Sequence, residues 1–425
     1  MYSRYTSRLV VEYFSSILVI GTGLFLGPEG PSLQLGSNIG QGVSEGFKQN
    51  KTNSRVLLAT GAASGLSAAF GAPLSGVLFM LETIFHNFSP RVGINALAGA
   101  LASNFVTSNI FGQQPVLAIA YDHPFPVVLY WHLLILGIIL GLLGHFYKMG
   151  LFSCKKLYAK IEFLPHWLLG LIPLAILIPI AYFLPLITGP GSRLILDLPE
   201  MVTKTGWIML GTLVFFYLLR LVFSIISYDS GLPSGVFLPV LTMGALIGAI
   251  YGLFMVQLHL LPRVLVVNLI IFSMAGSFAA VIRAPFTAII LITEMVGSLL
   301  HLMPLAVVAF IALFTDQLLG GKPIYDSLAQ AMEGKNGVSK TASGYGDQLT
   351  VPVYESSQLV GKKVAEIKWP KGTLVKVIHR SSQDIIPNGQ TEILAGDMLV
   401  LAVDSGQRGE VYNAMIKLQE VKFDG

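Results

Sequence analysis

Charged residues are scarce in this chain of 425 residues, and their scarcity excludes an ordinary soluble fold. Asp, Glu, Lys and Arg make up only 12% of the sequence, against about 25% in typical soluble domains. Hydrophobic residues reach 53%, and the mean hydropathy is +0.70. The composition therefore predicts a protein whose partner is the lipid membrane.

Cysteine is almost absent as well. Cys154 is the single cysteine, which excludes an intrachain disulfide and a cysteine-rich metal site. The eight histidines lack ligand spacing, and the sequence contains no P-loop, dinucleotide fingerprint or serine–histidine–aspartate order. The net charge of +4 is spread out, without a clustered basic face for nucleic acid. We therefore expect no enzyme, no metal, no cofactor and no nucleic-acid partner.

Long apolar runs are what the sequence does contain. About 20 apolar residues are enough to span a bilayer as a helix. Four candidate runs meet this requirement: Val127–Phe146, Leu164–Ile187, Trp207–Ile226 and Val264–Ile282. The 44 glycines exceed what simple lipid-facing helices need, and they favour tight helix packing and interrupted helices.

The chain also repeats itself. Glu82 follows Pro73 by nine residues, and Glu294 follows Pro285 by the same nine. Upstream, a second set of residues recurs at an offset of 208: Pro31, Gly36 and Gly40 match Pro239, Gly244 and Gly248. Internal repeats with broken helices are typical of secondary transporters and related channels. The second repeat is predicted to begin near residue 128.

The two halves are unequal in length. Phe237 follows a lead-in of roughly 107 residues (237 − 130) that starts near Tyr130, whereas only 28 residues precede Glu29. Equal halves would need about 79 further residues (107 − 28) at the front. We expect a truncated product, a misassigned start or a protein that does without those helices.

Glu29 is the most informative residue. It lies in a glycine–proline stretch, residues 27–31 (GPEGP), and a rough echo occurs at residues 235–239 (GVFLP). Lipid tolerates irregular backbone and ionisable side chains only where they line a cavity or pathway. Pro31 suits the first turn of a helix predicted over Ser32–Gly42, whose free N–H groups would point toward Glu29.

This geometry predicts an anion site without a full positive charge. Pro239 sets up the same helix start in the second half, so two positive helix ends would converge. Such weak binding lets an anion leave again, which conduction requires. Glu29 could occupy the site when ionised and swing away when protonated. The alternative is that Glu29 only caps a helix at a membrane edge.

Four motifs together resemble the CLC chloride channels and chloride/proton antiporters. They are Gly27–Gly40, Leu58–Glu82, Ser230–Gly252 and Gly320–Tyr325, and the resemblance extends from about Tyr13 to Gln330. It implies an all-α polytopic membrane domain of inverted repeats with broken helices over residues 1–330, acting as a homodimer. It also implies chloride as the transported partner.

The resemblance assigns roles to particular positions. Glu29 matches the gate and proton acceptor of the family. The anion-binding positions are then Gly27, Gly30, Val236, Phe237 and Tyr325, with backbone amides at Val236 and Phe237 and a hydroxyl at Tyr325. Taken alone, Tyr325 could also be an interfacial belt tyrosine.

The chain departs from the family pattern at several positions. Pro28 replaces a basic residue at the outer mouth, and Thr83 stands where antiporters carry an inner proton glutamate. Threonine cannot carry a proton as a carboxylate does, so proton coupling is expected to be weak or absent. Glu82 and Glu294 are expected to have structural partners in the bundle. The family's earliest anion-binding serine precedes anything in this sequence.

The tail has a different composition. Residues 331–347 are polar and glycine-bearing, which predicts a linker. Beyond it, Leu374–Ile378 and Met398–Val403 are predicted strands, joined by glycine-containing turns. Residues 348–425 resemble the TrkA-C regulatory domain of prokaryotic ion transporters. This resemblance implies a small β-rich α+β domain on the cytosolic side that senses a small ligand or serves as a passive assembly module.

The leading prediction is therefore chloride transport across the cell membrane, gated by Glu29, with the C-terminal domain in the cytoplasm. Antiport and uncoupled conductance both remain open. One alternative is a truncated, non-conducting membrane protein with a ligand-sensing tail. Another is a fluoride-selective relative, although such relatives tend to lack the tyrosine that this chain keeps at Tyr325.

Overall fold

The protein divides into two compact units, Met1–Ala329 and Gln330–Gly425. The computed structural model describes residues 2–85, 88–119, 123–161, 165, 168–203, 206–321, 323–325, 347–353, 357–380, 383–403, 410–411, 414–415 and 418. The predicted linker therefore lies almost wholly outside the described residues.

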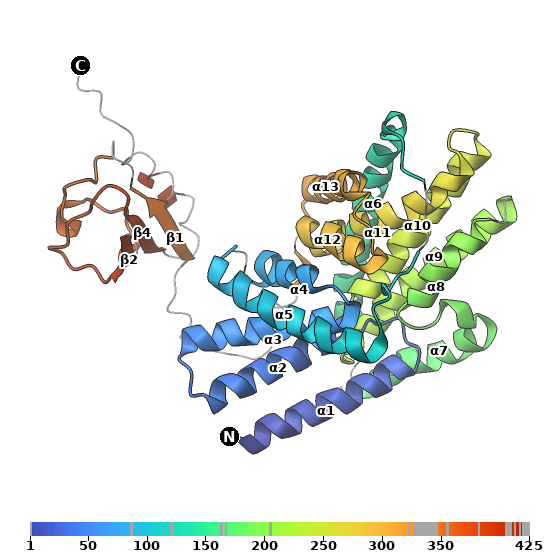
Figure 1. Cartoon of the computed structure of the whole chain (residues 1–425), viewed down its shortest axis with the longest axis horizontal. Helices are drawn as coiled ribbons and strands as arrows, with labels where there is room; N and C mark the ends of the chain where they lie inside the picture. The colour runs from blue at the N-terminus through green and yellow to red at the C-terminus, as the bar shows by residue number, and fades with distance from the viewer. Residues whose placement is uncertain are drawn as a thin grey trace. The chain divides into compact units, whose positions relative to one another are not determined.

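The first unit is built from α-helices, which are labelled in Figure 1. Its first five helices are α1 (Tyr2–Gly21), α2 (Glu29–Gly46), α3 (Lys51–Phe70), α4 (Pro73–Phe79) and α5 (Pro90–Phe111). The others are α6 (Trp131–Tyr158), α7 (Leu171–Phe183), α8 (Ser192–Met201), α9 (Trp207–Asp229), α10 (Phe237–Gln257), α11 (Val266–Ile282), α12 (Pro285–Val296) and α13 (Leu302–Leu318). Among the residues that the structure describes, four helical stretches could cross a membrane by length and composition: Val127–Tyr158, Trp207–Asp229, Phe237–Gln257 and Arg263–Ile282.

The internal repeat is visible in the helix order. The sequence offsets pair α1–α5 with α9–α13, and α2 lies beside α3 as α10 lies beside α11 (Figure 1). Glycine makes these close approaches possible. A Cβ atom on Gly36 would lie 2.1 Å from the Gly61 carbonyl oxygen, and one on Gly248 would lie 2.4 Å from that of Leu269.

Two predicted helices differ in the structure. The helix expected over Ser32–Gly42 is α2, which begins three residues earlier at Glu29 and continues to Gly46. Pro31 still lies in the first turn, where a missing N–H costs nothing. The apolar run Leu164–Ile187 is not one continuous helix. Within its described part, α7 covers only Leu171–Phe183 and is followed by a 3₁₀ turn at Pro185–Ile187. Prolines inside and after α7 shorten it.

The described part of the second unit contains an antiparallel sheet of four strands. These are β1 (Asp347–Pro352), β2 (Thr373–Arg380), β3 (Gln383–Ile385) and β4 (Met398–Val403), in the order β1-β4-β2-β3. The two predicted strands coincide with β2 and β4. Their alternating side chains bury one face, with Ile378, Leu399 and Leu401 fully buried.

Candidate functional site

A backbone bridge joins the two glycine–proline stretches. The Gly27 N–H donates to the Gly235 carbonyl oxygen at 2.9 Å, and the Gly235 N–H donates back at 3.0 Å. Neither position has room for a side chain. A Cβ atom on Gly27 would lie 1.9 Å from one carboxylate oxygen of Glu29, and one on Gly235 would lie 2.2 Å from the other. The glycines therefore form the walls around the Glu29 carboxyl.

Glu29 is fully buried and occupies the N-terminus of the opposite repeat's helix. Its Oε1 accepts a hydrogen bond from the Phe237 N–H, at the first residue of α10. The Leu238 amide also lies within hydrogen-bonding range of this carboxyl. Its Oε2 has no partner among the described residues. A carboxylate thus sits where free N–H groups and the helix dipole favour negative charge.

Sequence chemistry explains why α10 starts here. Pro239 lies in the first turn of α10, and Val236 is the residue directly before the helix. The Val240 N–H donates to the Val236 carbonyl oxygen at 3.0 Å. Nearly every residue of α10 is buried, so packing fixes the helix in place. Gly30, at the start of α2, lies against the second loop, since a Cβ there would come within 2.2 Å of the Ser234 carbonyl oxygen.

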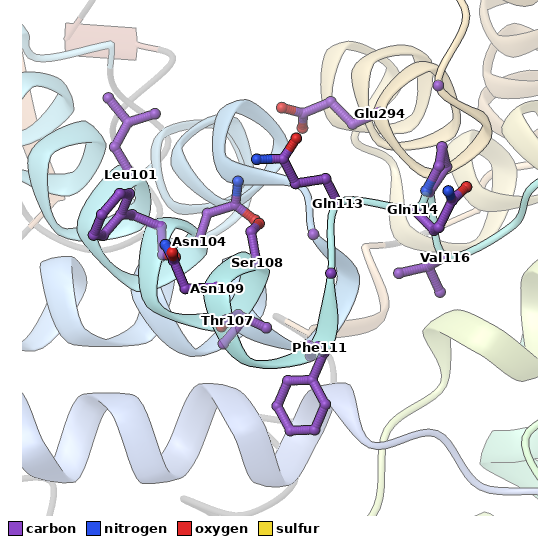
Figure 2. Close-up of a pocket in the computed structure, with 17 residues that line it drawn as sticks. Leu101, Asn104, Thr107, Ser108, Asn109, Phe111, Gln113, Gln114, Val116 and Glu294 are labelled. Carbon is purple, nitrogen blue, oxygen red and sulfur yellow. The ribbon is translucent and has the colours of Figure 1, made fainter.

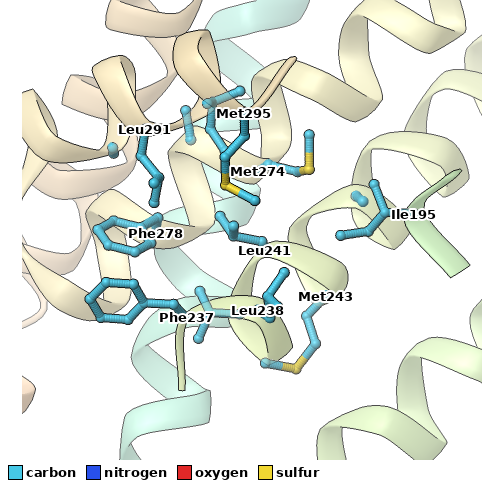
Figure 3. Packing of buried hydrophobic residues seen from close by; sticks show 14 of the residues in the cluster. Ile195, Phe237, Leu238, Leu241, Met243, Met274, Phe278, Leu291 and Met295 are labelled. Atoms are coloured by element: carbon cyan, nitrogen blue, oxygen red, sulfur yellow. The ribbon is translucent and has the colours of Figure 1, made fainter. Parts of the chain in front are cut away.

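Aromatic rings hold the Phe237 residue whose amide binds Glu29. Its ring centroid lies 4.7 Å from that of Phe278 and 5.0 Å from that of Phe79, both in edge-on geometry. Figure 3 shows Phe237 facing Phe278 within this buried cluster. Such contacts restrain the ring. They therefore fix the direction of the N–H group at the helix start.

Tyr325 packs against the same rings. Its ring centroid is 5.8 Å from that of Phe79 and 6.4 Å from that of Phe237. Tyr325 also lines a cavity of about 380 Å³ together with Thr83 and Arg283. The structure thus brings Glu29, Phe237 and Tyr325 together in that order, although they come from three distant parts of the sequence.

Thr83 lies in a short π-helical turn, Met80–Ile84, that continues α4. The Phe85 N–H donates to the Met80 carbonyl oxygen at 2.9 Å, which closes this wider turn. The Thr83 hydroxyl is buried and has no partner within the described part of the chain. Single π-turns of this kind often mark functional sites. No feature of the sequence had predicted it.

Glu82 and Glu294 cap each other's repeat. Glu82 accepts the Phe286 and Thr287 N–H groups at 3.2 and 2.8 Å, at the start of α12. Glu294 accepts the Leu74 and Ser75 N–H groups at 3.0 and 2.8 Å, at the start of α4. The expectation of structural partners for both acids is met, because each carboxylate serves a helix N-terminus.

Arg220, the single charge in its apolar run, is a buried structural cation. Its guanidinium donates to the carbonyl oxygens of Ile187 at 2.7 Å and Pro190 at 2.9 Å, just before α8. It also lies 4.5 Å above the Phe25 ring. The sequence signal for it was the rarity of charge inside a membrane span.

A large cavity of about 1000 Å³ lies elsewhere, between α3, α5 and the segment that follows α5. Figure 2 shows its polar lining, which includes Asn104, Ser108, Gln113 and Glu294. The lining residues of this cavity do not include those at the helix ends near Glu29, so the two sites are separate. Glu294, which belongs to the lining, caps α4. Among the described residues, no cluster of three His, Cys, Asp or Glu side chains could hold a metal ion.

Two protein-family models match this chain. The family model described as "Voltage gated chloride channel" matches residues 3–317, and the TrkA-C domain model matches residues 349–415. The H(+)/Cl(-) exchange transporter ClcA of Klebsiella pneumoniae subsp. pneumoniae is 32% identical over 346 residues, which cover 80% of this chain and 72% of that protein. The transporter of the same name from Salmonella typhi is 32% identical over 336 residues, which cover 76% and 69%.

Solved structures agree with these relatives. A slow cyanobacterial Cl−/H+ antiporter superposes with a TM-score of 0.71 at 28% identity, covering 78% of this chain and 77% of that one. A CLC-type fluoride/proton antiporter superposes with a TM-score of 0.58 at 23% identity, covering 69% and 71%, which shows the shared fold. Inverted repeats, broken helices and paired helix ends define a polytopic membrane transport protein.

The chain belongs to the voltage-gated chloride channel (CLC) family and carries a C-terminal TrkA-C domain. Both resemblances drawn from the motifs are confirmed. The all-α membrane unit of the CLC type and the small β-rich tail domain are confirmed as well. Members of this family are transporters, so the expectation that the chain is not an enzyme is also confirmed.

Proposed function

We propose that the protein transports chloride along a pathway in which Glu29 is the gate. The observation that carries this proposal is the Glu29 carboxylate bound to the Phe237 N–H at the N-terminus of α10. That carboxylate occupies a position suited to any small anion. A chloride ion and the carboxylate would therefore compete for the same amides, and the pathway would conduct when the carboxylate leaves.

The mechanism follows from the chemistry of the helix end. Protonation removes the negative charge of Glu29 and weakens its hold on the Phe237 amide. The side chain then swings away, and the amides of Val236 and Phe237 bind chloride in its place. Because the site offers dipoles and no full positive charge, the anion is held loosely enough to move on. Gly27 leaves the space that the Glu29 carboxyl fills in the closed state, and Gly30 lets the start of α2 pack against the Ser234 carbonyl oxygen.

On the inner side, Tyr325 would hand the anion on through its hydroxyl group. Its position against Phe237 and beside the cavity of about 380 Å³ supports this role. The retained tyrosine also favours chloride over fluoride as the substrate. Equal reconstituted fluxes of fluoride and chloride would instead support the fluoride-selective alternative.

The relatives and the residue at position 83 support different degrees of proton coupling. The curated relatives are named as H(+)/Cl(-) exchangers, which supports coupled exchange. Thr83 in place of an inner glutamate supports weak coupling, because its hydroxyl cannot hold a proton as a carboxylate does. We propose exchange with weak proton coupling. Vesicles in which a chloride gradient moves no protons would show an uncoupled protein.

The assembly and placement follow from the family and from the tail. We propose a homodimer in the cell membrane, with an anion pathway in each subunit. We place the TrkA-C domain in the cytoplasm, where it would bind a small ligand and regulate the membrane unit. Cross-linking in intact membranes and protease access from each side of the membrane test these two points.

Chloride efflux from proteoliposomes tests the gate. Glu29→Gln removes the charge but keeps the shape, and Glu29→Ala removes the side chain. Both should raise efflux and abolish its pH dependence, because a hydrogen bond to a charged group worth about 1.5–3 kcal/mol no longer closes the site. That energy corresponds to a change of about tenfold or more.

Efflux that stays at the wild-type level in both variants would remove Glu29 from the mechanism. No efflux from any of the three proteins would support the non-conducting alternative. The matched control is Glu45→Gln, at the exposed end of the same helix α2, which should leave efflux unchanged.

A further inference from the structure

We propose that Lys148 and Asp316 are positioning residues for Tyr325. The inference rests on the role proposed above for Tyr325 in the anion pathway. It concerns a buried ion pair between α6 and α13, outside the helix ends at Glu29. The pair holds the turn that follows α13, and that turn holds the tyrosine.

The ion pair joins three helices deep inside the unit. Lys148 Nζ on α6 lies 2.6 Å from Asp316 Oδ2 on α13, and the two side chains are 3% and 0% exposed. Asp316 Oδ1 lies 3.1 Å from Nδ1 of His145, one turn earlier on α6. Lys148 also donates to the Ala280 carbonyl oxygen at 3.0 Å, near the end of α11. Every oxygen of the Asp316 carboxylate is therefore engaged.

The same aspartate holds the turn that follows α13. The Gly321 N–H donates to the Asp316 backbone carbonyl oxygen at 3.0 Å. A Cβ atom on Gly321 would lie 2.2 Å from both carboxylate oxygens of Asp316, so the carboxylate packs directly on this glycine. From the other side, Arg283 Nη1 donates to the Gly321 carbonyl oxygen at 3.0 Å. Gly321 is thus clamped between two helices.

Tyr325 comes only four residues after this clamped glycine. The intervening Pro323 restricts the backbone, and Ile324 is fully buried in the main core. These features leave little freedom between Gly321 and the tyrosine ring that meets Phe79 and Phe237. A change in the position of Gly321 would therefore move the Tyr325 hydroxyl.

A buried ion pair is a poor way to gain stability, because desolvation offsets most of the attraction between the charges. Apolar residues of similar volume often serve a fold as well or better. What the charged pair adds is direction: Lys148 has donors for the aspartate and for Ala280, and the aspartate fixes the glycine. This is the behaviour expected of residues that hold a functional group in place.

A double-mutant cycle between Asp316 and Tyr325 tests the proposal. The variants are Asp316→Asn, Tyr325→Phe and their combination, each reconstituted as the full chain and measured for chloride-over-nitrate selectivity. We expect Asp316→Asn to shift selectivity in the same direction as Tyr325→Phe, by about twofold or more, because residues coupled through a shared backbone shift interact at least this strongly. The combined variant should match Tyr325→Phe alone.

The matched control is His132→Asn. His132 is another buried polar residue of α6, bonded to Tyr251 at 2.9 Å and distant in sequence from the clamp. It should leave selectivity unchanged and add nothing to Tyr325→Phe. If Asp316→Asn fails to fold, Lys148→Met combined with Asp316→Leu replaces the pair by apolar side chains of similar size. This pair should fold yet show the same selectivity shift.

The outcomes separate the two proposals. Wild-type selectivity in the Asp316 variants, or effects of Asp316→Asn and Tyr325→Phe that simply add, would overturn the positioning role while leaving Tyr325 in the pathway. Wild-type selectivity in Tyr325→Phe would remove Tyr325 itself from the anion site, and the positioning role with it. A shared, non-additive shift in the single and combined variants supports the inference.

Discussion

Glu29 connects the two repeats through a single hydrogen bond. Its carboxylate belongs to α2, whereas the amide that it binds belongs to Phe237 of α10. The bridge between Gly27 and Gly235 holds these loops at a fixed spacing. In the proposed mechanism, rotation of the Glu29 side chain would open the pathway without a separate moving domain.

Thr83 gives a direct test of coupling at the residue scale. We predict that Thr83→Glu increases proton movement driven by a chloride gradient at least about tenfold, since a positioned acid typically contributes about a hundredfold or more. Thr83 lines the same cavity as Tyr325, so a longer carboxylate side chain at this position is expected to reach it. Proton uptake by vesicles, recorded with a pH-sensitive dye, measures the effect.

Thr83→Val is the control, because it matches threonine in shape but carries no proton. It should leave proton movement at the wild-type level. Equal proton movement in Thr83→Glu and Thr83→Val would contradict the view that this position limits coupling.

In the tail domain, Asp397 provides a prediction about pH. Burial alone would raise the pKa of this carboxyl, but hydrogen bonds from the Arg380 side chain and the Leu394 amide outweigh burial and lower that pKa. The folded-state pKa therefore lies below the unfolded value of about 3.9. The carboxylate stabilises the domain above that value, and the contribution is lost as the pH falls through the folded-state pKa.

We predict that Asp397→Asn lowers the local free energy of unfolding by about 2 kcal/mol at neutral pH and removes this acid dependence. Hydrogen exchange of the β4 amides in the full chain measures it. Asp384→Asn is the control, because Asp384 is 73% exposed beside His379 and such exposed pairs contribute little. Similar protection in the two variants would count against the role of Asp397.

At the scale of elements, the two short helices α4 and α12 depend on each other. Each helix begins with a proline. Glu294 binds the N-terminal amides of α4, and Glu82 binds those of α12. Cross-capping of this kind ties the halves together at a second place, apart from the bridge at Gly27. The capping glutamates therefore have a structural role.

We predict that Glu82→Gln and Glu294→Gln destabilise the protein by similar amounts, about 1–2 kcal/mol each, because each change removes a charged cap. Thermal unfolding in detergent should show lowered midpoints for both. Glu45→Gln, on the exposed end of α2, should unfold like the wild type. A large effect from only one of the two capping variants would argue against the symmetric arrangement.

The sequence predicted those features that depend on local chemistry. A helix start set by Pro239, structural partners for Glu82 and Glu294, and strand β4 all follow from proline, charge and alternation patterns. It did not predict the π-turn around Thr83 or the engagement of Asp316 with Gly321. Both are local, since Phe85 bonds to Met80 and Gly321 follows Asp316 by five residues. Hydrophobic periodicity nevertheless distinguishes neither a π-turn from an α-helix nor the direction in which a carboxylate points.

The whole molecule consists of two units with separate cores. The membrane unit brings glycine-lined loops from both repeats together at the N-terminus of α10, and this arrangement gives the transport proposal its physical basis. The TrkA-C domain is a separate compact unit with its own core.

Bromide, which scatters anomalously, tests the central claim most directly. Crystals of Glu29→Gln grown in bromide should show one ion within hydrogen-bonding distance of the Phe237 N–H, at the place that the Glu29 carboxylate fills in the wild type. Crystals of the wild type in the same bromide should show the carboxylate there. If the variant showed bromide elsewhere in the membrane unit but none at the N-terminus of α10, that result would contradict the proposed anion site.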